Sequence, residues 1–382
     1  MDKIRDFIRL LKQTYQEDNI LLHRPVFSHR EVNYLTECIK SNFVSSVGER
    51  VVEFENLIAN YVGVRRAVAC VNGTAALHVA LKAVGVSLGS QVITQALTFV
   101  ATSNAINYCG ADPVFIDVDI DSLGMSPKAL QAWLDDNVTV EAGQTINKHN
   151  GKIISCCLPM HTFGMPCRIK EIAEICMSFG IPLVEDTAES LGSRVENQHT
   201  GTFGVAAAFS FNGNKTITTG GGGMIVTNDI ELADKLMHLT TTAKHPHTFE
   251  YFHDEVGYNY RLPNINAAMG VAQMEILDQI LERKSKLAAT YKHFFSEKGI
   301  TFVEPINGSV SNNWLNAIIL NNRAERDQFL QVTNDSGVMT RPIWNLMTDL
   351  PMYSMCQNDG LRNSRWLVDR VVNIPSSVPS IG

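Results

Sequence analysis

The chain has 382 residues, of which 45% are hydrophobic and 19% are charged, and its formal net charge is −7. This composition is typical of a soluble globular protein of roughly two or three domains, and the acidic balance argues against a nucleic-acid-binding surface. No run of about 18 apolar residues occurs, so we expect no membrane-spanning helix and a cytoplasmic protein. The eight cysteines form no CxxC pair, which predicts buried free thiols and no metal site.

Residues 1–20 are expected to form a helical extension. Charged residues interrupt the apolar ones, which recur at helical spacing at Ile4, Phe7, Ile8, Leu11 and Tyr15. This pattern excludes a signal peptide. It favours a helix that packs on its own protein over one that lies on a membrane surface.

From about residue 65 the chain alternates short β-branched runs with helical patterns. Strands are expected at 65–71, 91–94, 113–117, 152–158 and 181–185. Helices are expected between them at 74–84, at 99–108, from the Ser126 cap and Pro127 onward, and at 169–179. This alternation predicts an α/β fold with a mostly parallel sheet covered by helices on both faces.

The pattern changes in the last third of the chain. Two further strands are expected at 206–211 and 224–227, and a long amphipathic pattern covers 264–281. After about residue 290, a strand at 314–320 and a helix at 324–334 predict a smaller α+β domain. We therefore expect a large α/β domain over 21–290 and a small α+β domain over 291–382.

Lys215 follows the predicted strand 206–211 and precedes a glycine-rich run over 218–223. A lysine near glycines is usually a solvated surface residue. Here the preceding strand is apolar on both faces, so its end should be buried, which lowers the pKa of an amine. A neutral amine can attack an aldehyde, and this context favours a lysine that forms a Schiff base. The glycine run is not a P-loop, because the GxxxxGK[ST] order is absent.

Two acids follow the predicted strand 181–185. Asp186 lies at the carboxyl end of that strand, where open α/β sheets bind ligands. A carboxylate there can keep a pyridine nitrogen protonated, although capping of a helix is an equally good explanation of an aspartate in this position. Glu189, one helical turn further on, is placed to reach the 3′-oxygen of such a ring, although a lone acid is more often solvated.

An anion site is predicted at the same edge of the sheet. The N–H groups of Gly73 to Ala75 and the Thr74 hydroxyl open a helix there. Phe99 begins the next helix and is placed either to stack on an aromatic ring or to fill the core. An amine, a carboxylate and phosphate donors are the three requirements of pyridoxal 5′-phosphate, which we therefore expect as the cofactor.

Together these motifs resemble the pyridoxal-phosphate sugar aminotransferases of the DegT/DnrJ/EryC family, which have the aspartate-aminotransferase-type fold (PLP fold type I). The resemblance begins near residue 20, reaches the C-terminus and takes in 71–77, 97–102, 159–164, 185–189, 209–223, 257–264 and 373–377. The common Gly-Glu-Gly-Gly after the lysine is four glycines here, at 220–223.

The resemblance implies a role for each matching residue. Lys215 would bind the cofactor covalently and catalyse, Asp186 would pair with the pyridine nitrogen and Glu189 would contact the 3′-oxygen. Phe99 would stack on the ring. Phosphate contacts are implied for Gly73, Thr74, Ala75 and Ser210 and, from the neighbouring subunit of a homodimer with shared active sites, for Asn259.

Within the family, the chain is similar to aminotransferases of bacterial nonulosonic (legionaminic) acid pathways, on the N-terminal extension, 45–48, 240–244 and 339–344. That similarity implies glutamate as the amino donor and a UDP-linked 2-acetamido-4-keto-2,6-dideoxyhexose as the acceptor. Candidate substrate contacts are Arg261 and Lys244 for carboxylate or phosphate groups, His161 for sugar hydroxyls, and Tyr260. Ordinary surface cations and a structural histidine are the alternatives.

Other functions remain open. A sugar 3-dehydratase of the same architecture carries histidine in place of the lysine, so Lys215 counts against it. A regulatory homologue without catalysis would be expected to lack Lys215 or Asp186 or to carry a DNA-binding appendage. An NAD-linked sugar dehydrogenase needs GxGxxG after the first strand, and the segment 72–76 lacks it.

Overall fold

A mixed sheet forms the centre of the computed structural model, which describes residues 2–379. Two sets of strands compose it: β3 (Asp112–Ile116), β2 (Gln91–Gln95) and β6 (Ile154–Leu158); then β7 (Val184–Asp186), β10 (Ala206–Ser210), β11 (Gly223–Thr227) and β1 (Arg66–Cys70). Parallel bridges from Cys157 to Leu183 and from Met160 to Asp186 join the two sets. β11 runs antiparallel to both its neighbours, and the pairs within β3-β2-β6 and β10-β7 are parallel. The predicted mostly parallel sheet is confirmed.

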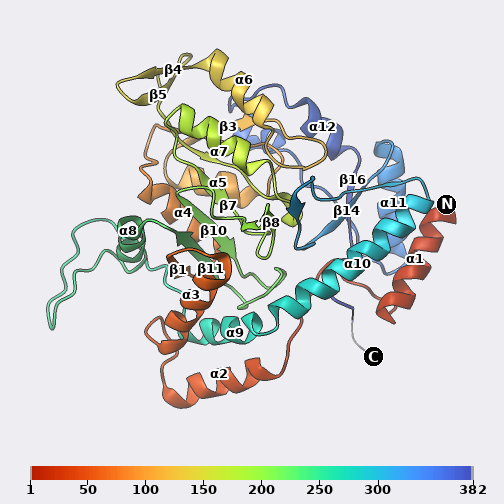
Figure 1. Ribbon diagram of the computed structural model, residues 1–382, viewed down its shortest axis with the longest axis horizontal. Coiled ribbons are helices and arrows are strands. Elements are labelled where there is room, and N and C mark those ends of the chain that lie inside the picture. The colour runs from red at the N-terminus through yellow and green to blue at the C-terminus, as the bar shows by residue number, and fades with distance from the viewer. Residues whose placement is uncertain (1, 380–382) are drawn as a thin grey trace.

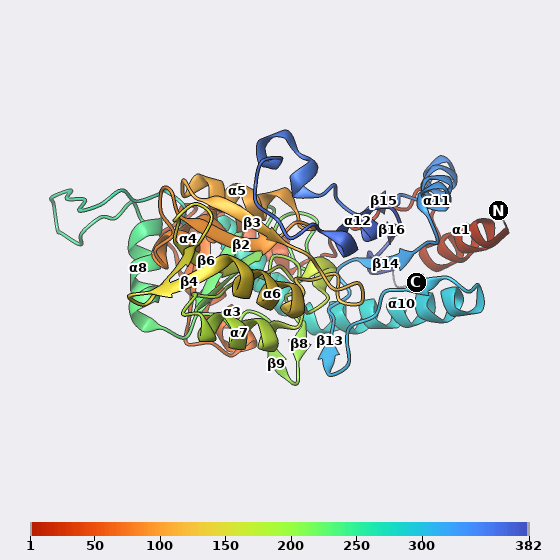
Figure 2. The same cartoon turned by 90° about the horizontal axis from the view of Figure 1, so that it is seen from above.

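Helices cover both faces of this sheet, as Figure 2 shows. Successive residues of β1 point to opposite faces, so Val68 packs with one set of helices and Ala67 with the other. The first set is α4 (Gly73–Ala83), α5 (Val100–Tyr108) and α8 (Ile230–Thr240); the second includes α3 (Glu49–Val62) and α9 (Asn264–Met274). Near β2, β3 and β6, the covering helices are α6 (Pro127–Asn137) and α7 (Ile169–Ser178). Burial on both faces explains why these strands read as continuous apolar runs.

The C-terminal part has its own antiparallel sheet and core. Its strand order is β12 (Thr301–Phe302), β14 (Asn316–Ile319), β16 (Val371–Ile374) and β15 (Arg341–Pro342), with α11 (Arg323–Asp335) and α12 (Arg362–Val368) beside it. The N-terminal helix α1 (Asp2–Tyr15) packs here, far from it in sequence (Figure 1). Phe7 of α1 is fully buried, and its ring lies 4.9 Å from that of Phe295 and 5.8 Å from that of Phe329.

The amphipathic pattern over 264–281 is divided between two helices. α9 ends at Met274 and α10 (Leu277–Glu297) begins after Ile276, whose φ of −113° and ψ of 2° leave the helical range. This break redirects the chain, so α10 runs from the central sheet to the C-terminal part. The predicted domain boundary at 290 falls inside α10. The division into domains stays a prediction. Residue 1 of the predicted N-terminal extension and residues 380–382 of the predicted small domain lie outside the described residues.

Several short elements have no counterpart in the sequence analysis. Among them are α2 (Arg30–Ser41), the hairpin of β4 (Val138–Glu141) and β5 (Gln144–Asn147), and a small sheet of β13 (Ser309–Val310), β8 (Arg194–Val195) and β9 (Gln198–His199). Of the helices within residues 2–379, none combines the length and the apolar character needed to cross a bilayer.

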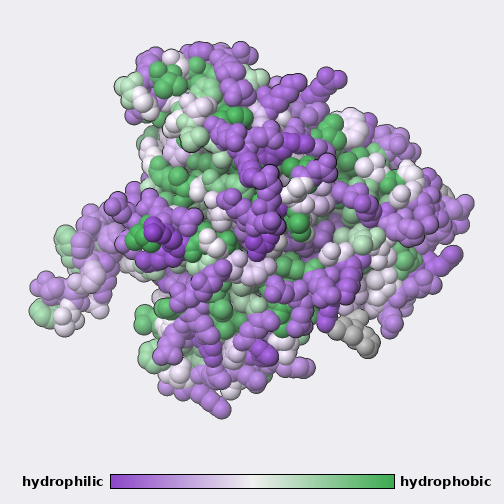
Figure 3. All heavy atoms as spheres, in the orientation of Figure 1, coloured by the Kyte–Doolittle hydropathy of each residue, from purple (hydrophilic) through white to green (hydrophobic). Residues whose placement is uncertain are grey.

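Residues 241–259, here called the arm, project from the body between α8 and α9 (Figures 1 and 2). Thr241 pairs with Asn259 and Lys244 with His253, so the two legs of the arm lie side by side. Apolar groups are visible along the arm in Figure 3, and its exposed large hydrophobic side chains are Phe249, Tyr251, Phe252 and Val256.

Candidate active site

A cavity of about 740 Å³ lies between the carboxyl ends of the central strands and the C-terminal part. Its walls therefore come from segments far apart in the chain. Lining residues include Gly73, Thr74, Phe99, Thr102, Asp186, Glu189, Ser210, Lys215, Trp314, Arg341, Trp344 and Asn373. The structure thus brings together most of the residues that the sequence predicts for cofactor binding.

Lys215 is held at the cavity wall by an acid and an aromatic ring. Its Nζ lies 3.2 Å from Glu189 Oε1 and 4.0 Å from the centroid of the Trp314 ring. The Trp314 indole is fixed in turn, because its Nε1 donates to Asn214 O at 2.7 Å. Only 13% of the Lys215 side chain is exposed. The amine is therefore positioned by contacts and is not a solvated surface group.

Asp186 is a buried carboxylate at the end of β7. Thr102 Oγ1 donates to its Oδ2 at 2.7 Å, and Ala188 N donates to its Oδ1 at 3.1 Å. Burial raises the pKa of Asp186, while the hydrogen bonds from Thr102 and Ala188 and the charge of Lys215 oppose that rise. The bond from Ala188 stabilises the turn after β7, so the turn-stabilising and cofactor-binding interpretations of this residue are compatible.

Glu189 lies deeper than a solvated helix residue would. Its Oε2 accepts from Phe163 N at 2.8 Å, and its Oε1 pairs with Lys215. Burial raises the pKa of Glu189 to about 7, although the charge of Lys215 and the Phe163 hydrogen bond act in the opposite direction. A carboxyl with this pKa can accept or release a proton near neutral pH.

The start of α4 forms one end of the cavity. A Cβ on Gly73 would lie 2.8 Å from Ser210 Cβ, so glycine permits the close approach of α4 to β10. Asn72 caps the helix, with its Oδ1 accepting from Ala75 N at 2.7 Å. The Ala75 N–H is thus already bonded, and Gly73, Thr74 and Ser210 are the members of the predicted phosphate group that line the cavity. Free N–H donors at a helix start suit a phosphate.

Phe99 belongs to the cavity and not to the core. It precedes α5, and 49% of its surface is exposed. Its ring centroid lies 6.2 Å from that of Trp344, which lines the same cavity. An exposed aromatic face beside Lys215 and Asp186 fits the predicted stacking role.

Two of the predicted substrate contacts have partners inside the protein. His161 is fully buried; its Nε2 lies 3.0 Å from Glu185 Oε2, and its Nδ1 accepts from Cys167 N at 3.3 Å. Arg261 Nη1 pairs with Glu55 Oε1 at 2.7 Å and donates to Ala69 O at 3.0 Å. Neither residue lines the cavity of its own chain.

Lys244 and Asn259 lie on the arm and Tyr260 directly follows it, and none of the three lines the cavity of the same chain. Lys244 Nζ lies 4.0 Å from the ring centroid of Tyr251, and Asn259 is exposed. Tyr260 stacks on Tyr258, with 5.1 Å between the ring centroids. Their roles in substrate or cofactor binding stay predictions.

The structure adds cavity residues to which the sequence analysis gave no role: Thr102, Trp314, Trp344, Arg341 and Asn373. Arg341 Nη1 donates to Asn334 Oδ1 at 3.2 Å and to Thr340 O at 3.1 Å, and within residues 2–379 no carboxylate pairs with it. The buried Asn373 Nδ2 has no hydrogen-bond partner in the described part of the chain. Thr102, Arg341, Trp344 and Asn373 lie in the family-like segments 97–102, 339–344 and 373–377, whereas Trp314 lies in none of these segments.

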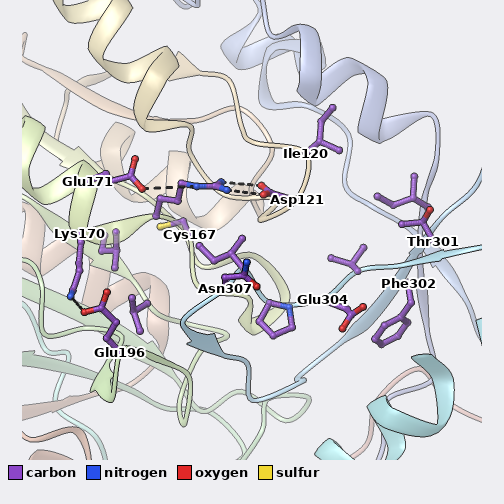
Figure 4. Close-up of a pocket in the computed structure, with 17 residues that line it drawn as sticks. Ile120, Asp121, Cys167, Lys170, Glu171, Glu196, Thr301, Phe302, Glu304 and Asn307 are labelled. Carbon is purple, nitrogen blue, oxygen red and sulfur yellow. Dashed lines mark hydrogen bonds and ion pairs between the residues drawn. The ribbon is translucent and has the colours of Figure 1, made fainter. Parts of the chain in front are cut away.

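A second cavity of about 600 Å³ lies between the start of α7 and the segment 301–307 (Figure 4). Its cations are already paired: Arg168 binds Asp119 and Asp121 at 2.6 and 2.7 Å, and Lys170 binds Glu196. Lys215 and Asp186 do not line it. This cavity is therefore not the active site.

Comparison with known proteins agrees with this geometry. Residues 25–380 match the model of the DegT/DnrJ/EryC1/StrS aminotransferase family. The chain belongs to this family. It is a pyridoxal-phosphate-dependent aminotransferase with PLP fold type I, so the family, fold and cofactor predicted from the sequence are confirmed.

Three similar proteins illustrate the relationship. EpsN of Bacillus subtilis (strain 168), named as a pyridoxal phosphate-dependent aminotransferase, is 38% identical over 87% of this chain and 84% of its own. The GDP-perosamine synthase of Escherichia coli O157:H7 is 37% identical over 88% of this chain and 87% of its own. The crystal structure of DesI with its TDP-sugar product superposes with a TM-score of 0.82 at 26% identity, covering 94% of this chain and 88% of that one.

Proposed function

We propose that the enzyme transfers the amino group of glutamate to the C4 ketone of a nucleotide-linked 4-keto-6-deoxyhexose, with UDP-2-acetamido-4-keto-2,6-dideoxyhexose as the preferred acceptor. Its product would enter bacterial surface-glycan or nonulosonic-acid synthesis. The observation that carries the proposal is one cavity that combines Lys215, Asp186 and Glu189 with Arg341, which has no acidic partner among residues 2–379. The similarity to a GDP-perosamine synthase and to DesI, solved with a TDP-sugar, supports a nucleotide-sugar acceptor.

The cavity residues fit pyridoxal phosphate in a defined orientation. Asp186 would hold the pyridine nitrogen, the start of α4 with Ser210 would hold the phosphate, and Phe99 would cover the ring. When bound, the cofactor withdraws electrons from the substrate carbon that loses or gains a proton. Lys215 Nζ lies 3.2 Å from Glu189 Oε1, and the Glu189 pKa of about 7 suits this carboxyl to hold a proton or return it to the amine.

Arg341 is our candidate for binding the donor carboxylate or a nucleotide phosphate. A guanidinium can bind either group through two parallel hydrogen bonds. Arg261 pairs with Glu55 in the same chain, whereas Arg341 lines the cavity and, among the described residues, donates to the uncharged oxygens of Asn334 and Thr340. Replacing Arg341 with lysine keeps the charge but removes the paired hydrogen bonds, so it separates the two contributions.

We further infer a homodimer in which the arm of one subunit completes the active site of the other. Asn259 is exposed and lies outside its own cavity, and the arm carries exposed hydrophobic side chains. A two-fold arrangement would let both arms act at once. Mixing inactive Lys215→Ala and Asn259→Ala chains should then restore part of the activity, since one of the two sites in a mixed dimer is intact. A fully active monomer in sedimentation would contradict the shared site.

The substrate proposal is tested with a panel of UDP-, TDP- and GDP-linked 4-keto-6-deoxysugars, with and without a 2-acetamido group, each incubated with glutamate. Product masses and NMR spectra should show an amine at C4 and formation of 2-oxoglutarate. Loss of a sugar hydroxyl without amine transfer would indicate a dehydratase. Binding of a sugar without turnover would indicate a regulatory homologue.

A further inference from the structure

Two histidines and one aspartate connect the arm to α8. His238 lies in the last turn of α8, His245 on the outgoing leg of the arm and Asp254 on the returning leg. His238 Nε2 lies 2.7 Å from Asp254 Oδ1, and His245 Nε2 lies 2.8 Å from Asp254 Oδ2. Three separate backbone segments therefore converge on one carboxylate at the base of the arm.

These groups have the chemistry and spacing of metal ligands. One ligand atom from each residue lies within 4.8 Å of the others. Imidazole nitrogens and carboxylate oxygens bind Zn²⁺ at about 2.0–2.2 Å, so neighbouring ligand atoms around a tetrahedral ion lie roughly 3.4 Å apart. An ion would require each nitrogen–oxygen contact to lengthen by only about 0.6 Å on that geometry.

The surroundings leave the site open to an ion. The side chains of His238, His245 and Asp254 are 25%, 52% and 40% exposed, so an ion can enter from solvent and keep a water ligand. Glu255 Oε1 lies 3.9 Å from His238 Nε2 and offers a further oxygen.

A plain ion-pair network is the alternative explanation of this cluster. Exposed pairs between histidine and aspartate stabilise little, because water and salt screen them. Here two rings each present Nε2 to a different oxygen of one carboxylate. The ligand atoms of all three residues lie within 4.8 Å of one another, a spacing that a single ion can bridge.

We propose that His238, His245 and Asp254 bind a divalent transition-metal ion of the zinc class, with water or Glu255 as a further ligand. The ion links both legs of the arm to α8 and so fixes the direction in which the arm projects. None of the three ligands lines the cavity of Lys215 in the same chain, so the ion would act by holding the arm in place. The proposal is independent of the substrate that the enzyme uses. Ni²⁺ and Cu²⁺ would bind the same ligands.

Titration of the EDTA-treated full-length protein with Zn²⁺, followed by calorimetry, tests the site. The parent chain should bind one equivalent, and His245→Ala and Asp254→Asn should bind at least ten-fold more weakly. His247→Ala is the matched control, because His247 lies on the same arm but pairs with Glu250 at 4.0 Å, outside the cluster. A parent without saturable binding, or variants that bind as tightly as the parent, would overturn the proposal.

Limited proteolysis gives a second readout that does not depend on enzyme activity. Zn²⁺ should slow chymotrypsin cleavage after the arm residues Phe249, Tyr251 and Phe252 in the parent and in His247→Ala, but not in Asp254→Asn. Equal protection in Asp254→Asn would place the ion elsewhere. If a variant does not fold, the visible spectrum of the Co²⁺-loaded parent tests the proposed ligands instead. Bands from d–d transitions alone would support nitrogen and oxygen ligands, whereas a thiolate charge-transfer band would show that cysteine binds the ion and would overturn the proposal.

Discussion

At the scale of single residues, the site depends on carboxylates that the protein holds out of water. Asp186 and Glu189 are 2% and 3% exposed, and burial raises the pKa of both. Burying an ionised carboxylate destabilises a fold unless partners compensate, and here Thr102, Phe163 and Lys215 supply them. Groups of this kind are typical of functional sites, where a shifted pKa serves proton transfer.

Replacing Asp186 with asparagine tests its role. Asparagine is nearly isosteric: its oxygen can accept from Ala188 N, and its amide can donate to Thr102 Oγ1. It cannot keep the pyridine nitrogen protonated, so we expect turnover to fall by roughly 10²–10³. The melting temperature of the cofactor-free protein should change little. Normal turnover in this variant would restrict Asp186 to stabilising its turn.

Glu189 should leave a signature in the pH dependence of stability. The unfolded pKa is near 4.5 and the folded pKa about 7, so the folded state binds more protons between these values. The contribution of Glu189 to stability therefore falls as pH rises from about 4.5 to 7 and stays low above that range.

Glu189→Gln removes this loss. As pH rises across this window, the cofactor-free variant should become more stable relative to the parent, by on the order of 2 kcal/mol in unfolding free energy. Its melting temperature relative to the parent should rise accordingly. Melting curves at closely spaced pH values measure it. A variant that becomes less stable than the parent above pH 7 would show that the pair with Lys215 outweighs the burial of the carboxylate.

At the scale of helices and strands, the sequence predicted the parts whose pattern is local. The alternation of apolar strands and capped helices placed Asp186 and Lys215 correctly at the same edge of the sheet, because periodicity and strand ends are readable along the chain. The break at Ile276 and the indole of Trp314 over Lys215 were not predictable. Tertiary packing determines both, and no local pattern reports it.

Gly73 offers a test at this scale. Because a Cβ there would meet Ser210 Cβ at 2.8 Å, Gly73→Ala should push α4 away from β10 and destabilise the protein by about 1–3 kcal/mol. Binding of pyridoxal phosphate should weaken as well, since the phosphate donors move with α4. Gly221→Ala is the control: its nearest neighbour would be Val71 O at 3.8 Å, an ordinary contact. Equal melting temperatures for Gly73→Ala and Gly221→Ala would contradict the close approach of α4 to β10.

At the scale of the whole molecule, the chain folds back on itself, so its first helix completes its last core. Phe7 packs against Tyr291 and Phe295 of α10 and Phe329 of α11. Phe7→Ala should therefore destabilise the protein by about 3–5 kcal/mol. Hydrogen exchange should show the added opening in the C-terminal sheet. Arg5 is exposed on the same helix, so Arg5→Ala should change neither the stability nor the hydrogen exchange of the C-terminal sheet. Similar effects of both variants would contradict this packing.

The same arrangement has a consequence for biosynthesis. When α1 leaves the ribosome, the partners of Phe7 do not yet exist, and about 275 residues separate the end of α1 from Tyr291. At roughly 5–20 residues per second, that delay is about 15–60 s. During this time the apolar stripe of α1 has no native surface to cover it. We therefore expect the nascent chain to present this helix to chaperones, and its docking to be among the last steps of folding.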